Sequence, residues 1–251
     1  MLARKALLLV LLVVAPAIAM GAGLRLFQVR TANNFLFDVM VESNMGMSNG
    51  LNDAYDGCYM LRVAGSEVRT PSATILYGGR GVQSPRTAVG NLFKVSRQVY
   101  VPTKGDWARY YDLIVNTSSS KQSVEVEVFG NLGSDSSTKV TQTSDNDLSV
   151  ETSDLWFVTD DFEDGAGDPT LAHVFRRQGS KRSPERIALD MDNISIRYRL
   201  KLAPRGRAAL VFFAVQTSNS TEATKLAREL TAFGAPAKAH LSTEDIRRIQ
   251  N

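Results

Sequence analysis

Apolar and polar side chains alternate one by one along much of this chain, and that pattern limits the folds it can adopt. In the clearest example, Ile194–Leu202, five apolar residues point one way and four polar residues the other. Val124–Val128 repeats the pattern with two glutamates between three valines. A period of two residues is typical of strands that have one face in a core and the other in water. The sequence therefore predicts an all-β protein.

A second kind of apolar segment indicates a strand that is buried on both faces. Ala208–Val215 contains no polar residue, as expected at the centre of a sheet covered on each side. Turn-forming clusters such as Ser48–Gly50 and Tyr77–Gly81 separate the shorter apolar runs. The other predicted strands are Leu24–Val29, Phe35–Val39, Tyr59–Val63, Thr74–Tyr77, Phe93–Val101, Arg109–Val115, Leu155–Thr159 and Leu171–Phe175. Many short strands divided by turns favour an antiparallel β-sandwich, here one domain over residues 20–217.

The periodicity becomes helical after Gln216. Asn219 provides a capping residue, apolar residues then recur on one helical face, and Gly234 marks the end. A second short helix is predicted from Ser242, with acids in its first turn and arginines in its last turn, as the helix dipole favours. We therefore expect two short C-terminal α-helices over residues 218–251, which cap an exposed face or edge of the same domain.

Residues 1–19 have the features of a secretory signal peptide. Arg4 and Lys5 precede an unbroken apolar run, and Ala17 and Ala19 occupy the positions that a signal peptidase recognises. The apolar run is shorter than the roughly 20 residues that cross a bilayer. We expect cleavage before Met20 and a secreted or periplasmic protein. The alternative is an uncleaved signal anchor.

Several stretches resemble an uncharacterised β-sandwich module found in large secreted proteins of Gram-negative bacteria. They are 52–57 (NDAYDG), 95–102 (VSRQVYVP), 108–116, 131–135 (NLGSD), 156–161, 167–169 with 172–174, and the closing 241–251. The resemblance covers most of the chain after the leader, and it implies a β-sandwich. It brings no catalytic residues with it. Because the chain stops where the module stops, an adhesin-array role is not implied.

Charge and residue counts exclude several function classes. Without the leader the net charge falls to +1, which argues against nucleic acid as the main ligand. No later segment is apolar enough to cross a membrane. Cys58 is the only cysteine, so an internal disulfide is excluded, and it is expected to be a small buried hydrophobe rather than a reactive thiol.

The chain lacks the sequence patterns of common catalytic sites. It has no G-x-S-x-G, H-E-x-x-H, paired C-x-x-C or phosphate-binding glycine loop. Its two histidines cannot build a zinc site of several His or Cys ligands. His173 lies in an apolar strand and is expected to be structural, and His240 is expected to be exposed. Paired loop carboxylates, as in glycoside hydrolases, remain an alternative.

Charges are distributed unevenly in the second half of the chain. Residues 140–175 hold nine acids and no Lys or Arg, whereas residues 176–207 hold ten bases and three acids. Arg197, Arg199 and Lys201 alternate along one strand, so we expect them to share a face. They are either a solvated surface or a binding site for an acidic glycan, lipid head groups or the acidic segment of another copy. Self-association through opposite charges is one such outcome.

Aromatic and acidic residues suggest two further sites. Trp107 follows a Gly-Asp turn and is the better candidate to stack on a sugar, with packing in the core as its alternative, whereas Trp156 is expected in the core. Asp160, Asp161, Asp164 and Asp168 lie in a glycine-containing loop that could supply oxygen ligands to calcium. The alternative is a solvated acidic loop.

These observations favour binding over catalysis. We expect a secreted or periplasmic β-sandwich that recognises a glycan, a cell-surface component or a protein partner. Two alternatives stay open, a carbohydrate-active enzyme that uses loop carboxylates and a subunit of a surface assembly.

Overall fold

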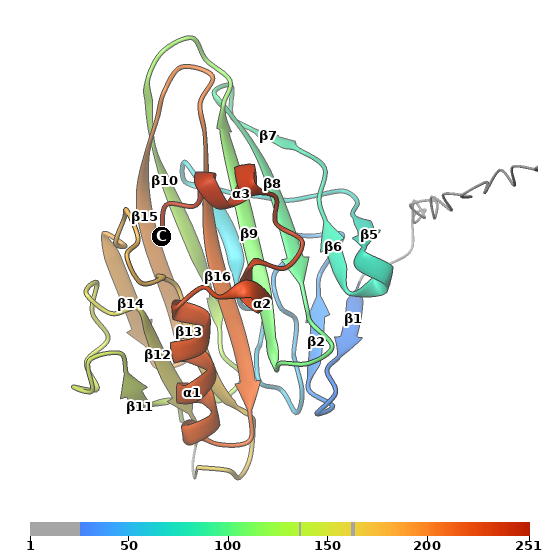
Figure 1. Ribbon diagram of the computed structural model, residues 1–251, viewed down its shortest axis with the longest axis vertical. Coiled ribbons are helices and arrows are strands. Elements are labelled where there is room, and N and C mark those ends of the chain that lie inside the picture. The colour runs from blue at the N-terminus through green and yellow to red at the C-terminus, as the bar shows by residue number, and fades with distance from the viewer. Residues whose placement is uncertain (1–25, 136, 162–163) are drawn as a thin grey trace, which may run out of the picture.

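Two antiparallel sheets stacked face to face form most of the molecule (Figure 1). The computed structural model describes residues 26–135, 137–161 and 164–251, so the predicted signal peptide lies outside the described residues. The predicted antiparallel β-sandwich is confirmed. Among the described residues, no helix is long and apolar enough to cross a membrane.

The large sheet has nine strands in the order β11-β12-β13-β16-β9-β8-β6-β5, and β7 also pairs with β8. Its strands are β5 (Thr74–Leu76), β6 (Gly81–Gln83), β7 (Thr87–Val89), β8 (Phe93–Tyr100), β9 (Trp107–Asn116), β11 (Lys139–Thr143), β12 (Trp156–Asp160), β13 (Thr170–Val174) and β16 (Arg207–Thr217). The short 3-10 helix η1 (Tyr77–Gly79) joins β5 to β6.

The small sheet has five strands in the order β14-β15-β10-β3-β4. They are β3 (Met60–Val63), β4 (Ser66–Glu67), β10 (Gln122–Asn131), β14 (Arg186–Asp190) and β15 (Asn193–Leu202). A separate two-stranded ribbon pairs β1 (Phe27–Arg30) with β2 (Leu36–Val39). The turn between β9 and β10 and the turn between β15 and β16 each connect the large sheet to the small sheet. Both turns lie at the same end of the sandwich, at the top of Figure 1.

The inward faces of the two sheets make the main core. The predicted alternation of β15 is confirmed, because its apolar residues are buried while the residues between them are half-buried or exposed. The predicted burial of 208–215 is confirmed as well, since β16 lies between β13 and β9 and is buried from Ala208 onward. Burying such apolar surface supplies most of the free energy of folding.

One ion pair is sealed inside this core. Arg97 of β8 donates from Nε and Nη2 to the two carboxylate oxygens of Asp112 on β9, at 2.7 and 2.8 Å. Their side chains are only 2% and 0% exposed. Arg97 also donates to the backbone carbonyl of Tyr59 and lies over the ring of Tyr110. A buried pair of this kind tolerates the loss of neither partner.

His173 is also part of the interior and is structural, as predicted. Its Nδ1 lies 2.9 Å from the hydroxyl of Tyr59, and its Nε2 lies 2.9 Å from the hydroxyl of Thr159. Burial lowers the pKa of His173 to about 3, so the ring is neutral at ordinary pH. Cys58 is likewise buried, and burial raises the pKa of its thiol to about 12. An inert thiol is consistent with the predicted packing role.

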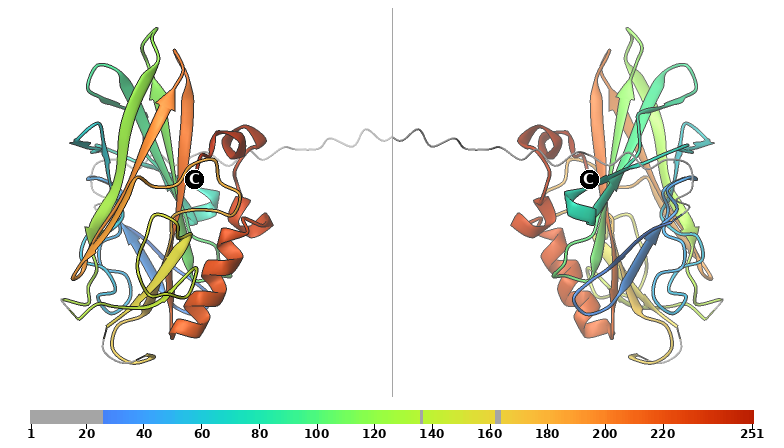
Figure 2. Two further views of the ribbon diagram at one scale, coloured as in Figure 1. Left: turned by 90° about the vertical axis from the view of Figure 1, so that its left-hand side faces the viewer. Right: turned by 90° about the vertical axis from the view of Figure 1, so that its right-hand side faces the viewer.

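The C-terminal helices cover the outer face of the large sheet, as the side views show (Figure 2). They are α1 (Ser220–Thr231), α2 (Ala235–Lys238) and α3 (Thr243–Arg248). The predicted caps are confirmed: the side chain of Asn219 accepts from Glu222 N, and Ser242 forms a capping box with Asp245. The sequence predicted two helices, but the segment after Gly234 forms the additional short helix α2, with Pro236 in its first turn.

Five strands were not predicted from the sequence. They are β4, β6, β7, β11 and β14, each two to five residues long. Short strands near Gly and Pro carry little alternation, and they form because a longer neighbouring strand supplies hydrogen-bond partners. Both β6 and β7 pair with β8.

Candidate functional site

Trp107 is buried, which corrects its prediction as a stacking surface. Its side chain is 3% exposed and lies edge-on to Tyr100 and Phe213, with ring centroids 6.0 and 5.5 Å away. It belongs to the core between the large sheet and the helices. Trp156, 2% exposed, belongs to the same core, as predicted. A ligand therefore reaches neither tryptophan.

Arg197 and Arg199 share the outer face of β15 as predicted, but each is paired with acids. Arg197 Nε donates to Glu127 Oε1 at 2.9 Å. Arg199 Nε donates to Glu185 Oε2 at 2.9 Å, and its Nη2 donates to Glu125 Oε2 at 3.3 Å. The two arginines therefore do not form the free basic strand face that their sequence suggested.

Glu127 is the centre of this salt-bridged face, which comprises Arg62, Glu125, Glu127, Arg197 and Arg199. Glu127 also accepts from the Ser195 hydroxyl at 2.6 Å and pairs with Arg62 from β3. Burial acts to raise the pKa of Glu127, but hydrogen bonds from Ser195, Arg197 and Arg62 outweigh it and hold the pKa below its ordinary value. The charges here are satisfied within the protein.

Lys201 lies two residues farther along β15 and belongs to a different environment. It lies at the end of the sandwich where the β9–β10 and β15–β16 turns meet. Four other cations lie at this end, and we call the group of five the basic end. Its members are Lys94, Lys121, Lys201, Arg205 and Arg207. In the described part of the chain, none of the five forms an ion pair, although Arg205 donates to the carbonyl of Thr117.

The sequence around the basic end explains why its charges are unpaired. Segments 84–96, 113–124 and 200–211 contain no aspartate or glutamate. They meet in space: Thr117 N donates to the Leu92 carbonyl at 2.8 Å, and Arg205 N donates to the Ser118 carbonyl at 3.0 Å. The buried Asn116 side chain links two turns, because its Nδ2 donates to the carbonyls of Ser120 and Ala203.

Two hollows lie at the basic end. One, of about 350 Å³, is lined by Lys94, Arg205 and Arg207 together with Asn91 and Thr117. The other, of about 490 Å³, is lined by Lys121, Lys201 and the turn between β15 and β16. Lys94 and Arg207 both lie opposite Val115 in the strand register, so they flank the same point of the large sheet. Each hollow offers several donors and no carboxylate.

The turn between β12 and β13 lies at the opposite end of the long axis, in the lower part of Figure 1, and it contains Asp161 and Asp168. Burial raises the pKa of Asp168, and the negative charges of Asp161, Asp53 and Asp135 raise it further. These four residues, which we call the acidic end, therefore lie close to one another. The molecule carries opposite charges at its two ends.

Three of the described acids of the predicted calcium loop, Asp160, Asp161 and Asp164, accept hydrogen bonds within the protein, whereas Asp161 Oδ1 is buried without a partner among the described residues. Asp160 accepts from Thr170 Oγ1 at 2.8 Å and from Asp161 N at 3.0 Å. Asp164 accepts from Ser220 N at 2.6 Å. Residues 162–163 lie outside the described residues, and among those described no group of three or more His, Cys, Asp or Glu is placed to hold a metal ion. The calcium site stays a prediction.

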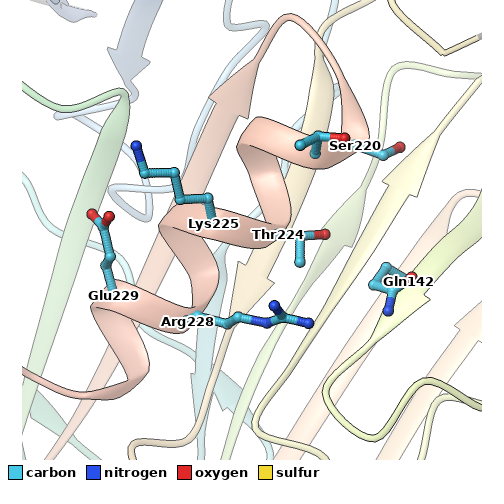
Figure 3. A pocket seen from close by; sticks show the side chains of 7 residues that line it. Gln142, Ser220, Thr224, Lys225, Arg228 and Glu229 are labelled. Carbon is cyan, nitrogen blue, oxygen red and sulfur yellow. The ribbon is translucent and has the colours of Figure 1, made fainter.

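A polar groove of about 510 Å³ runs beside α1. Figure 3 shows Thr224 and Arg228 facing Gln142 of the edge strand β11, whereas Lys225 and Glu229 point away from it. The other face of α1 packs on the sheet through Ala223, Ala227 and Leu230. The groove thus follows from the way this amphipathic helix seats beside an edge strand.

Comparisons with known proteins give only distant structural matches. No protein-family model matches the chain, and no curated protein matches it. A putative kojibiose phosphorylase from the human microbiome has a TM-score of 0.48 and 11% identity over 92% of this chain. The chain spans only 29% of the length of that phosphorylase.

Two further solved structures are similar at the same level. A putative aldose 1-epimerase from Escherichia coli K12 has a TM-score of 0.45 and 7% identity, covering 77% of this chain and 99% of the epimerase. A heparan sulfate lyase from Pedobacter heparinus has a TM-score of 0.45 and 10% identity, covering 74% of this chain and 30% of the lyase. Likeness this distant carries no functional argument, so function has to be inferred from the residues themselves.

Proposed function

We propose that this protein is a secreted or periplasmic binding protein that holds an anionic glycan at the basic end. The observation that carries the proposal is the contrast in pairing: Arg197 and Arg199 are neutralised by glutamates, whereas the five basic-end cations have no carboxylate partner among the described residues. Unpaired cations around a hollow attract and orient an anionic ligand.

Lys201 is the one predicted binding cation that contributes to this site. The sequence also singled out Arg205 and Arg207 as part of a basic segment, but it did not connect them with Lys94 and Lys121. A glycan is favoured over nucleic acid because the leader predicts export and the net charge without it is close to zero. The hollow at Lys94 opens on the outer face of the large sheet and the hollow at Lys201 on that of the small sheet, so each suits its own anionic group.

Binding to immobilised dextran sulfate and polygalacturonate tests the proposal, with neutral dextran as the uncharged control. We expect wild-type protein to bind the charged polymers at low ionic strength and to lose affinity as salt screens the charges. Replacing Lys94, Lys201 and Arg207 with Gln should weaken binding at least about tenfold, since each lost contact to a charged group is worth roughly 1.5 kcal/mol or more.

A variant with the same change in net charge controls for nonspecific attraction. Lys104, Lys181 and Lys225 are exposed and lie outside the basic end, and with the described residues they make no interaction that replacement by Gln would break. This control should bind within about twofold of wild type, because only distant charge is removed. Equal losses in the two triple variants, or wild-type protein that ignores both charged polymers, would refute the proposed site.

The proposed export is tested separately. If residues 1–19 are a signal peptide, intact-mass analysis of exported protein should give a chain that begins at Met20. Exported material that retains residues 1–19 would contradict this.

A subunit of a surface assembly is a second candidate, favoured by the opposite charges of the basic and acidic ends. Such a subunit should associate at low ionic strength and dissociate as salt increases. Sedimentation of the wild type and of the Lys94/Lys201/Arg207 triple variant would test it, with a monomer under all conditions counting against assembly.

A further inference from the structure

A small pocket lies next to the basic end on the same face of the large sheet. Its volume is about 200 Å³, and it is formed between α3 and the outer surface of β6, β8 and β9. Ser96, Gln98 and Tyr111 belong to its sheet side, whereas Asp245 and Arg248 come from α3. We call it the α3 pocket.

The α3 pocket and the Lys94 hollow are consecutive along two paired strands. Lys94 lies opposite Val115, and the next pair on that face, Ser96 opposite Leu113, already lines the α3 pocket. Residues two apart on a strand point the same way and are separated by about 7 Å. Arg86 lies beside this row of residues on β8. It lines the α3 pocket from the segment between β6 and β7, and both of these strands pair with β8.

On the side that faces the basic end, the pocket has hydrogen-bonding groups without partners in the described part of the chain. Among the described residues, the hydroxyl of Ser96, the Nε2 of Gln83 and the guanidinium of Arg86 have no partner. Only 7% of Ser96 is exposed, so its hydroxyl lies in a confined space. A polar ligand of the right size would satisfy these donors, since polar groups in confined sites are normally paired.

On the other side the pocket is closed by contacts within the protein. Gln98 Nε2 donates to Gln83 Oε1 at 3.3 Å, and Arg109 Nη2 donates to Gln98 Oε1 at 3.3 Å. Arg109 also donates to the carbonyl of Ala239 at 2.6 Å, which ties the segment before α3 to the sheet. Tyr111 donates to Asp245 Oδ1 at 3.2 Å. A chain that enters from the basic end meets these contacts on the far side of the pocket.

We infer that the α3 pocket holds one terminal sugar unit of an anionic glycan whose following units run along Arg86, Lys94 and Arg207. This inference rests on the proposed function and adds recognition of a chain end to it. The volume admits a single ring, and the amide, hydroxyl and guanidinium groups match sugar hydroxyls and carboxylates. Leu113 and Leu241 supply the apolar contact that a sugar ring requires on its C–H face.

Calorimetry with trigalacturonate, an anionic oligosaccharide in which two of the three sugars are chain ends, tests the inference. Ser96→Phe places a large side chain at the pocket and should weaken trigalacturonate binding at least about tenfold, while dextran sulfate binding stays within about twofold. Arg86→Gln, an exposed change that keeps the fold, should weaken trigalacturonate binding several-fold through the loss of one charged donor. Thermal melts would establish that Ser96→Phe is folded.

Control variants and outcomes separate this inference from the proposed function. Thr221→Phe lies in the groove beside α1 and should leave trigalacturonate binding unchanged. If wild-type protein binds dextran sulfate but not trigalacturonate, or if both pocket variants bind trigalacturonate as well as wild type does, end recognition is wrong while the basic end still binds anions. If wild type binds neither probe, the proposed function fails as well.

Discussion

Arg197 and Lys201 lie on the same face of the same strand, four residues apart, yet their charges have different roles. Arg197 contacts Glu127, which is held by three donors in the middle of the small sheet. Lys201 faces Ser123 in the neighbouring strand and lines a hollow at the end of the sandwich. The difference arises entirely from β10, whose glutamates stop at Glu125. Alternation on a strand predicts which residues share a face, whereas the neighbouring strand decides whether their charges are free.

The buried Arg97–Asp112 pair is the extreme case of pairing and should show the largest effect on stability. Asp112→Asn leaves Arg97 buried without a countercharge, so we expect the free energy of unfolding to fall by about 3–5 kcal/mol. Urea denaturation measures this. Asp190→Asn, an exposed change on the edge strand β14, should stay within about 0.5 kcal/mol of wild type. A cost for Asp112→Asn as small as that of the control would show that burial does not set the strength of pairing.

Glu127→Gln should have the next largest effect, because it weakens three hydrogen bonds to one carboxylate. We expect a loss of about 1–3 kcal/mol at neutral pH, as for hydrogen bonds to charged groups. The pKa of Glu127 in the folded state lies below its unfolded value of 4.5, so its contribution is complete above that pH. The contribution is lost as pH falls through the folded-state pKa.

Urea titrations from neutral to acidic pH therefore give a second measure of Glu127. The stability curves of wild type and Glu127→Gln should converge as pH falls below 4.5, because protonated Glu127 no longer differs in charge from Gln. Glu125→Gln, which removes a half-exposed partner of Arg199, should change the curve much less. Parallel curves for Glu127→Gln would contradict the assignment.

Arg197 and Lys201, two of the three cations of β15, provide the direct test of the comparison. Arg197→Gln should destabilise the protein by about 0.5–1 kcal/mol, the upper range for partly exposed ion pairs. Lys201→Gln should leave stability unchanged or raise it by a few tenths of a kcal/mol, because it relieves repulsion among the basic-end cations. The gain should shrink as salt is added. A larger loss for Lys201→Gln than for Arg197→Gln would reverse the distinction between the two regions.

Calcium should have the smallest effect. Asp160 and Asp164 already accept hydrogen bonds from the protein, and a metal ion would have to replace them. We therefore expect thermal midpoints with millimolar calcium and with chelator to agree within about 1 °C. A clear rise with calcium that is lost in Asp161→Asn would instead establish the predicted site at the acidic end.

The fold was more predictable from the sequence than the site. Long alternating strands such as β10 and β15 carry a period that survives in any sandwich, and the helix caps at Asn219 and Ser242 are local chemistry. Trp107 was misplaced because its burial depends on Phe213 and on α1 and α2, which lie more than 100 residues away. The position of Trp107 next to a turn in the sequence does not show whether distant segments bury its side chain.

The sequence predicted Lys201 as a binding residue and placed Arg205 and Arg207 in a basic segment, but its only signal for a connection with Lys94 and Lys121 was the lack of acids in three separate segments. Strand register brings two of the basic-end cations together, because it places Lys94 and Arg207 on either side of Val115. The α3 pocket was not predictable, since Gln83 and Arg86 come from a region whose strands are too short to be recognised. A site assembled from short strands and a distant helix requires the tertiary structure.

The separation of the basic and acidic ends gives the molecule an electric dipole along its long axis. Near an anionic surface such a dipole experiences a torque before it makes contact, and the torque turns the basic end forward. Each approach then samples fewer unproductive orientations, which raises the capture rate without a single added contact. Because the torque depends on both ends, neutralising acids at Asp161 and Asp168 should slow arrival at the surface even though these residues never touch the ligand.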